Sequence, residues 1–124
     1  MSGIQWLEVP EQHDYPAARS YLSLLLSPEE IEEVIALLLQ AETTFFKAKD
    51  ILRAAKLKAL GADNHHVARD LKKIKNSEAL SPIILIRGSL STGTRLTIAD
   101  GYHRVCAAYV YDEDVEVACQ IVGE

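Results

Sequence analysis

The 124-residue chain lacks several features that mark particular classes of protein. It has no apolar run long enough to cross a bilayer, since a spanning helix needs about 20 residues and stretches such as 22–26 are much shorter. It also lacks an excess of basic residues. Lys and Arg total 13 against 18 Asp and Glu, and the net charge of −5 argues against a general nucleic-acid binder. No basic segment precedes an apolar core in residues 1–16, so we expect no signal peptide.

Cysteine is scarce as well. The two cysteines, Cys106 and Cys119, lie in apolar periodic segments, and without an export signal we expect reduced, buried thiols in a cytoplasmic protein. Cys106 follows His103 by three residues, so a Cys–His nucleophile is one alternative, but the apolar neighbours of Cys106 favour an inert thiol. Neither His65 nor His66 has a correctly spaced cysteine partner, so we predict no dedicated metal site of the zinc type.

What the chain does contain is the content of a single globular domain spanning residues 1–124. Hydrophobic residues make up 48% and charged residues 25%, both ordinary values for a domain with one modest core. Residues 27–30, "SPEE", predict the start of a helix, because Ser27 can cap it and Glu30 completes a capping box. We expect residues 1–42 to form an N-terminal helical extension packed on the remainder.

The order of the expected elements indicates an α+β (mixed α/β) fold with a small mixed sheet and packed helices. Apolar periodicity of 3.6 or 2 residues predicts most elements, whereas β-forming residues predict the strand at 43–49 and a continuous apolar run predicts the strand at 83–87. Gly and Ser in residues 88–94 predict a hairpin connection. The expected helices cover 16–26, 28 onward, 50–61, 63 or 64 onward and 102–111, and the expected strands cover 43–49, 83–87, 95–99 and 115–122.

Residues 98–104, "IADGYHR", carry the strongest chemical signal. A strand, a turn and a helix amino terminus would present unpaired N–H groups, and Gly101 could adopt a positive φ and let a ligand approach. A bound phosphate would explain two cationic side chains at the positive end of a helix, because His103 and Arg104 can both donate to phosphate oxygens. On spacing alone an alternative is equally strong: Arg104 pairs with Asp100 or another carboxylate, and His103 is a surface residue.

Residues from about 43 to 122 resemble the ParB/sulfiredoxin superfamily. "LSPIILIRG", a hairpin, "LTIADGYHRVCAAY" and "VEVACQIV" follow that family's order of strand, strand, glycine-x-x-arginine helix and closing strand. The resemblance covers roughly two thirds of the chain. It implies a ParB/sulfiredoxin-like fold and contact with a nucleotide at the turn formed by Gly101, Tyr102, His103 and Arg104.

Members of this superfamily differ in activity. Sulfiredoxins carry a cysteine where this chain has Tyr102, so their thiol chemistry is not implied. ParB proteins bind CTP beside DNA-binding modules, for which this chain has no room. ParB-like free serine kinases carry aspartate-glycine-histidine-histidine-arginine, close to residues 100–104 here. Their catalytic glutamate falls near Asn64, and the adjacent Asp63 is a candidate substitute. Some other members are labelled nucleases.

A second cluster, "ADNHH" at 62–66, lies at an expected helix start. If this end faces the Gly101 turn, Asp63, Asn64 and His65 could supply a base or a nucleotide contact. The spacing favours the simpler alternative, in which Asp63 or Asn64 caps the helix beside solvated histidines.

These patterns predict a protein that binds a phosphate-bearing ligand, a nucleotide such as ATP, ADP or CTP, with Mg²⁺ as a candidate ion. As an enzyme it would be a phosphotransferase or a nucleotide or phosphodiester hydrolase. His103 would then stabilise phosphate charge, and Asp63 or Asp100 would act as base or hold Mg²⁺. The alternatives are a non-catalytic nucleotide-sensing or protein-interaction module and a DNA-binding or nuclease domain. DNA is the less favoured partner, no membrane partner is expected, and a homo-oligomer stays open.

Overall fold

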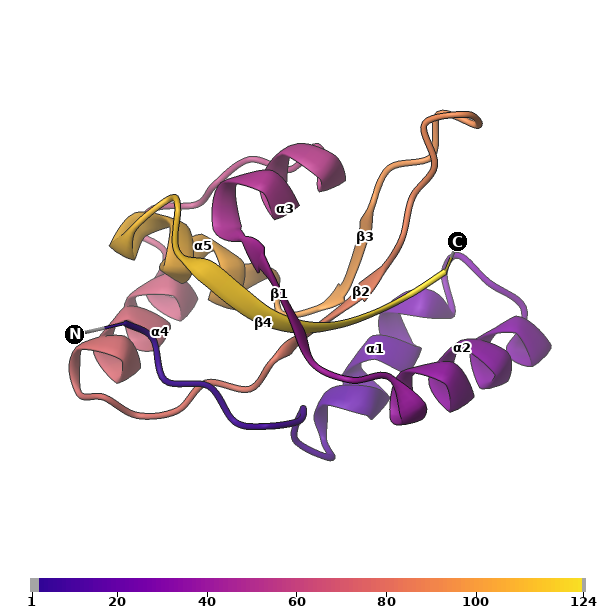
Figure 1. Ribbon diagram of the computed structural model, residues 1–124, viewed down its shortest axis with the longest axis horizontal. Helices are drawn as coiled ribbons and strands as arrows, with labels where there is room; N and C mark the ends of the chain where they lie inside the picture. Colours follow the sequence, from indigo (N-terminus) through magenta and orange to yellow (C-terminus); the bar gives the residue numbers. More distant parts are fainter. Residues whose placement is uncertain (1–2, 124) are drawn as a thin grey trace.

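The computed structural model describes residues 3–123 and shows five helices and a four-stranded mixed sheet, as expected for an α+β fold (Figure 1). Residues 1, 2 and 124, which belong to the expected domain and its N-terminal extension, lie outside the described part. Along the chain the elements are α1 (Asp14–Leu22), α2 (Pro28–Gln40), β1 (Thr44–Lys47), α3 (Ala48–Ala55), α4 (His65–Lys75), β2 (Ile83–Ile86), β3 (Thr97–Asp100), α5 (Tyr102–Tyr111) and β4 (Glu116–Val122).

The sheet has the order β1-β4-β2-β3, so the last strand in the sequence lies at its centre. β4 pairs antiparallel with β1 and parallel with β2, and β2 pairs antiparallel with β3. Cys119 is opposite Thr44 on one side and Ile83 on the other. β4 therefore joins two halves of the chain that are far apart in sequence.

Two hydrophobic cores lie on opposite faces of this sheet. Alternate residues of β2 point to opposite faces, and Ile83 and Leu85 join the core under α3, α4 and α5. Ile84 joins the second core, under α1 and α2. Figure 1 shows these two groups of helices on the two sides of the sheet. Because both faces are covered, Gln120 is buried where the alternation of β4 alone would expose it.

Local signals set most of the helix ends. Ser27 accepts a hydrogen bond from the Glu30 amide and Glu30 accepts one from Ser27, so the predicted capping box is present at the start of α2. Asn64 caps α4 through hydrogen bonds from the amides of His66 (2.9 Å) and Val67 (3.2 Å). This confirms one of the two predicted caps.

Two helices differ from the expected bounds. α1 runs from Asp14 to Leu22 and not from 16 to 26, and Pro16 lies in its first turn, where proline is tolerated. The prediction of a helix over 50–61 is wrong at both ends. α3 begins at Ala48, directly after β1, and stops when Lys56 adopts a left-handed conformation (φ 57°). No glycine signals this end, and residues 57–64 are irregular.

The cysteines behave as expected, since Cys106 and Cys119 are free and buried. Burial raises the pKa of Cys106, and it raises that of Cys119 to about 12, so both stay protonated thiols. In residues 3–123, no helix is long and apolar enough to cross a membrane.

The N-terminal helices predict the outcome of a truncation. Together α1 and α2 supply Ala18, Leu22, Ile31, Ile35 and Leu38 to the second core. We expect a fragment of residues 43–124 to expose that face of the sheet and to lose cooperative unfolding. Thermal melts followed by near-ultraviolet circular dichroism measure this. A monomeric fragment that melts cooperatively would contradict it.

Candidate functional site

The turn between β3 and α5 depends on close packing at Gly101. Gly101 has φ 111°, a conformation that favours glycine. A Cβ at this position would lie 2.4 Å from Cγ2 of Ile83 and 3.0 Å from Nη2 of Arg104. The positive φ is as expected, but the space beside Gly101 is filled by β2. This glycine is therefore required by packing between the turn and the sheet.

Arg104 is held by protein groups on three sides. Its Nη2 donates to Oδ2 of Asp100 at 2.7 Å, and its Nη1 donates to the carbonyl of Ser81 at 2.8 Å. Nη1 also lies 3.5 Å from Oδ2 of Asp14, at the start of α1. Of the two arrangements that the sequence left open, the structure has the one in which Arg104 pairs with carboxylates.

The carboxylates around Arg104 form a compact polar cluster. The Ser81 hydroxyl donates to Asp14, and the Glu11 amide donates to Asp14 Oδ2 (3.2 Å) and to Ser81 Oγ (3.0 Å). Burial raises the pKa of Asp100, and although Arg104 opposes this, the neighbouring Asp14 adds to the rise. One guanidinium thus faces two carboxyl groups, and the pKa of the Asp100 carboxyl lies above its ordinary value.

A polar pocket of about 250 Å³ opens beside this cluster. It lies between the start of α1, one face of α4, the residues before β2 and the amino end of α5. Gly101 provides no side chain to cap α5, whereas Ser27 and Asn64 cap their helices, so the first turn of α5 presents its N–H groups without a side-chain cap. The lining residues are Glu11, His13, Asp14, Arg69, Asp70, Lys73, Ala79, Leu80, Ser81, Asp100, Gly101, Tyr102, His103 and Arg104.

Three histidines form a row that ends at this pocket. The ring centroids of His65 and His66 are 4.0 Å apart, and those of His66 and His103 are 4.6 Å apart. Desolvation, followed by the charges of His65 and His103, lowers the pKa of His66. Arg69 Nη2 also lies 3.4 Å from His66 Nδ1. A cationic imidazole in this row repels its neighbours, and an anion would relieve that repulsion.

The predicted site residues divide into two groups. Asp100, Gly101, Tyr102, His103 and Arg104 all line the pocket, although the Tyr102 hydroxyl donates to the carbonyl of Lys58. His65 reaches the pocket only through the histidine row, Asn64 is engaged as a helix cap, and Asp63 is exposed in the turn before α4 and is not part of the lining.

Sequence reasoning did not find every group in the pocket. Asp14 and Ser81 are brought to Arg104 by the packing of α1 against β3, and no local pattern indicates that contact. Lys73 and Arg69 also line the pocket, and no pattern in the sequence singles them out as site residues. The adjacent histidines His65 and His66 could have suggested that this face of α4 packs near the Gly101 turn.

Comparisons with known proteins add no family: no protein-family model, no curated protein and no solved structure matched this chain. Across residues 3–123, no group of three or more His, Cys, Asp or Glu side chains is arranged to hold a metal ion. The residues of the pocket itself are therefore the basis for its chemistry.

The Arg104 cluster predicts a pH-dependent loss of stability. Arg104→Ala leaves Asp14 and Asp100 without their cation, and we expect a loss of about 3 kcal/mol near neutral pH. Without Arg104 the pKa of Asp100 rises further above its unfolded value. A raised carboxyl pKa gives stability that is present at low pH and lost as pH rises through the folded value.

The deficit of Arg104→Ala should therefore shrink as pH falls toward 4–5. Chemical denaturation of both proteins across this pH range measures the difference. Arg104→Lys is the matched variant and should recover part of the loss, since it keeps the charge without the planar fork. A deficit that is absent, or equal at all pH values, would contradict this account.

Proposed function

We propose that the chain binds a phosphate-bearing ligand, a nucleotide, in the polar pocket at the amino end of α5. One observation carries the proposal: a helix terminus without a side-chain cap opens into a pocket that is also lined by His103, Lys73 and Arg69. Unpaired amides and the helix dipole favour an anion at this end. Arginine and lysine add charge-assisted hydrogen bonds to phosphate oxygens.

The residues divide the work of binding between them. The amides of the first turn of α5 would face the phosphate, with His103 and Lys73 donating from the side. Arg104 is a positioning residue, because its contacts with Asp100, Ser81 and Asp14 hold the turn against β3, the residues before β2 and α1. Its charge also offsets the two carboxylates that would otherwise repel a phosphate.

The resemblance to the ParB/sulfiredoxin superfamily supports the same ligand class at the same turn. Within that proposal the chain is a phosphotransferase or a nucleotide or phosphodiester hydrolase. His103 then stabilises phosphate charge, and the carboxyl of Asp100 is the acid–base candidate in the lining. Magnesium would enter with the nucleotide, through phosphate oxygens and water. A nucleotide-sensing module is the non-catalytic alternative.

Lys73→Gln tests the binding site. We expect calorimetric titration with ATP, ADP, CTP and inorganic phosphate, with and without Mg²⁺, to show at least one saturable ligand, and Lys73→Gln to weaken it about tenfold, near 1.4 kcal/mol. Lys75→Gln is the matched control, since Lys75 is an exposed lysine of the same helix outside the lining. Equal effects of the two substitutions, or no binding at all, would refute the site.

Product analysis with each bound nucleotide then separates an enzyme from a sensor, because saturable binding without turnover excludes the enzyme.

The histidine row predicts how binding depends on pH. The pKa of His66 is lowered in the free protein, and a bound anion favours its protonated form, so binding takes up protons. Affinity should therefore be highest at acidic pH and fall as pH rises through the histidine range. NMR titration of the imidazole protons with and without inorganic phosphate measures this directly. An affinity that is flat between about pH 5.5 and 8 would exclude the histidines from the site.

A further inference from the structure

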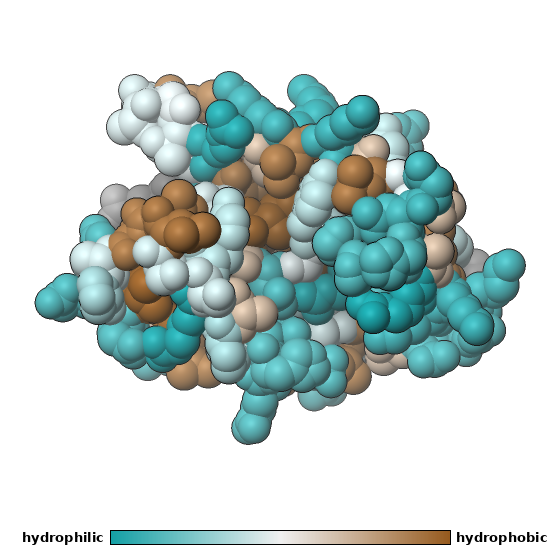
Figure 2. Space-filling view, turned by 180° about the vertical axis from the view of Figure 1, so that it is seen from behind, coloured by the Kyte–Doolittle hydropathy of each residue, from teal (hydrophilic) through white to brown (hydrophobic). Residues whose placement is uncertain are grey.

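A second cavity lies away from the Gly101 turn, and different residues line it. It is a groove of about 430 Å³ between α3 and the hairpin that joins β2 to β3, and its lining is largely apolar. Figure 2 shows a recess with apolar atoms at its floor below the hairpin. Its volume is in the range of about 300–1,000 Å³ that is usual for small-molecule sites.

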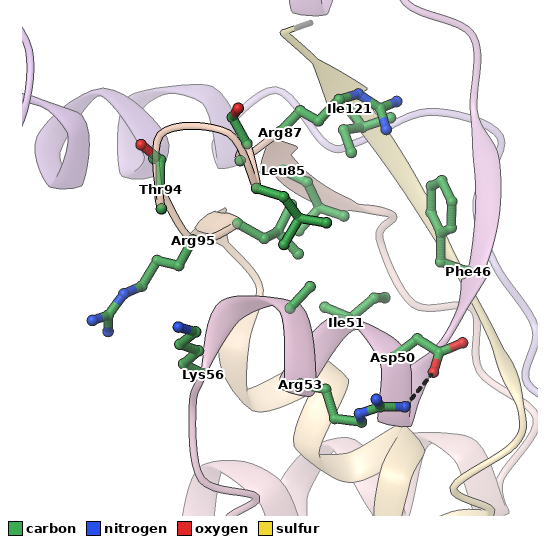
Figure 3. A pocket seen from close by; sticks show the side chains of 16 residues that line it. Phe46, Asp50, Ile51, Arg53, Lys56, Leu85, Arg87, Thr94, Arg95 and Ile121 are labelled. Carbon is green, nitrogen blue, oxygen red and sulfur yellow. Dashed lines mark ion pairs between the residues drawn. The ribbon is translucent and has the colours of Figure 1, made fainter.

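The floor of the groove is the edge of the main core. Ile51, Leu85 and Leu96 are buried in that core and also line the groove. Phe46 and Ile121 complete the apolar wall toward β1 and β4 (Figure 3). The side chain of Leu90, in the hairpin, is fully exposed at the rim. An occupant with an apolar body would remove from water the apolar surface that Phe46 and Leu90 leave exposed.

The rim of the groove is positively charged although the whole chain is acidic. Four cationic side chains line it against one carboxylate, Asp50, which already lies 3.7 Å from Arg53. Lys56, Arg87 and Arg95 have no ion pair within residues 3–123. Figure 3 shows Lys56 and Arg95 at one end of the groove and Arg87 at the other. The uncompensated positive charge at the rim favours an occupant that carries an anionic group.

We propose that this groove binds a small amphiphilic anion, an unbranched alkyl chain with one carboxylate or phosphate head. The alkyl chain lies on Ile51, Leu85 and Leu96, and the head lies between Lys56 and Arg95 at the open end. Arginine and lysine bind either head group through charge-assisted hydrogen bonds. This ligand class differs from the nucleotide proposed for the polar pocket, and the two proposals stand independently.

Lys56 offers a variant that separates binding from folding. It has φ 57° at the end of α3, a conformation that suits glycine better than lysine. Lys56→Gly should therefore keep or raise the melting temperature while it removes one head-group contact. If Lys56 had only a structural role, Lys56→Gly would not weaken ligand binding while it kept or raised the melting temperature.

The test uses the full chain with sodium decanoate and decyl phosphate below their micelle concentrations, followed by amide chemical shifts in NMR spectra. We expect saturable shifts confined to the groove for both anions, and affinity about tenfold lower for 1-decanol and for Lys56→Gly with Arg95→Gln. Ala54→Trp, which fills the groove from an exposed position on α3, should abolish binding, and Lys72→Gln on α4 should leave it unchanged.

Several results would overturn the proposal. One is equal binding of decanol and decanoate, which would leave the cationic rim without a role. Another is a set of shifts spread over the whole surface. A third is attachment to anionic vesicles without saturable binding of either soluble anion, which would indicate a membrane contact by the hairpin.

Discussion

The guanidinium of Arg104 is the contact on which the arrangement of the polar pocket depends. It joins α5 to β3 through Asp100, to the residues before β2 through the Ser81 carbonyl, and to α1 through Asp14. Two buried carboxyl groups near each other would be costly alone, and a single shared cation makes the cluster tolerable. Because Asp14 at the start of α1 contacts the same guanidinium, the N-terminal part of the chain contributes directly to the candidate site.

Much of the secondary structure follows from local rules that the sequence shows directly. The capping box at Ser27, the cap at Asn64, the continuous apolar run of β2 and the alternation of β3 can all be recognised within a few residues of sequence. The end of α3 does not, because Lys56 takes a conformation that its side chain gives no reason to expect. Gln120 was also missed as a buried residue. It is paired with Tyr15 and the Ala41 carbonyl, and both partners come from a distant part of the chain.

The sequence predicts where the candidate site lies, but it does not predict which side chains come together there. The strand, turn and helix around Gly101 are local, so their pattern predicted where N–H groups and cations would gather. Which group each side chain contacts is a matter of long-range packing, and Arg104 could not be assigned to a phosphate or to a carboxylate beforehand. Lys73 and the histidine row entered the site only because α4 packs against α5.

The place of β4 in the sheet has a consequence for the order in which the chain can fold. Among the strands of residues 3–123, β1 has β4 as its only neighbour, and β2 and β3 join β1 through β4. During synthesis β1 is made before β4. It therefore stays unpaired, with Phe45 and Phe46 exposed, until β4 has been made. The hairpin of β2 and β3 can close before then, but the sheet cannot. The sheet therefore stays incomplete from the synthesis of β1 until β4 has been made.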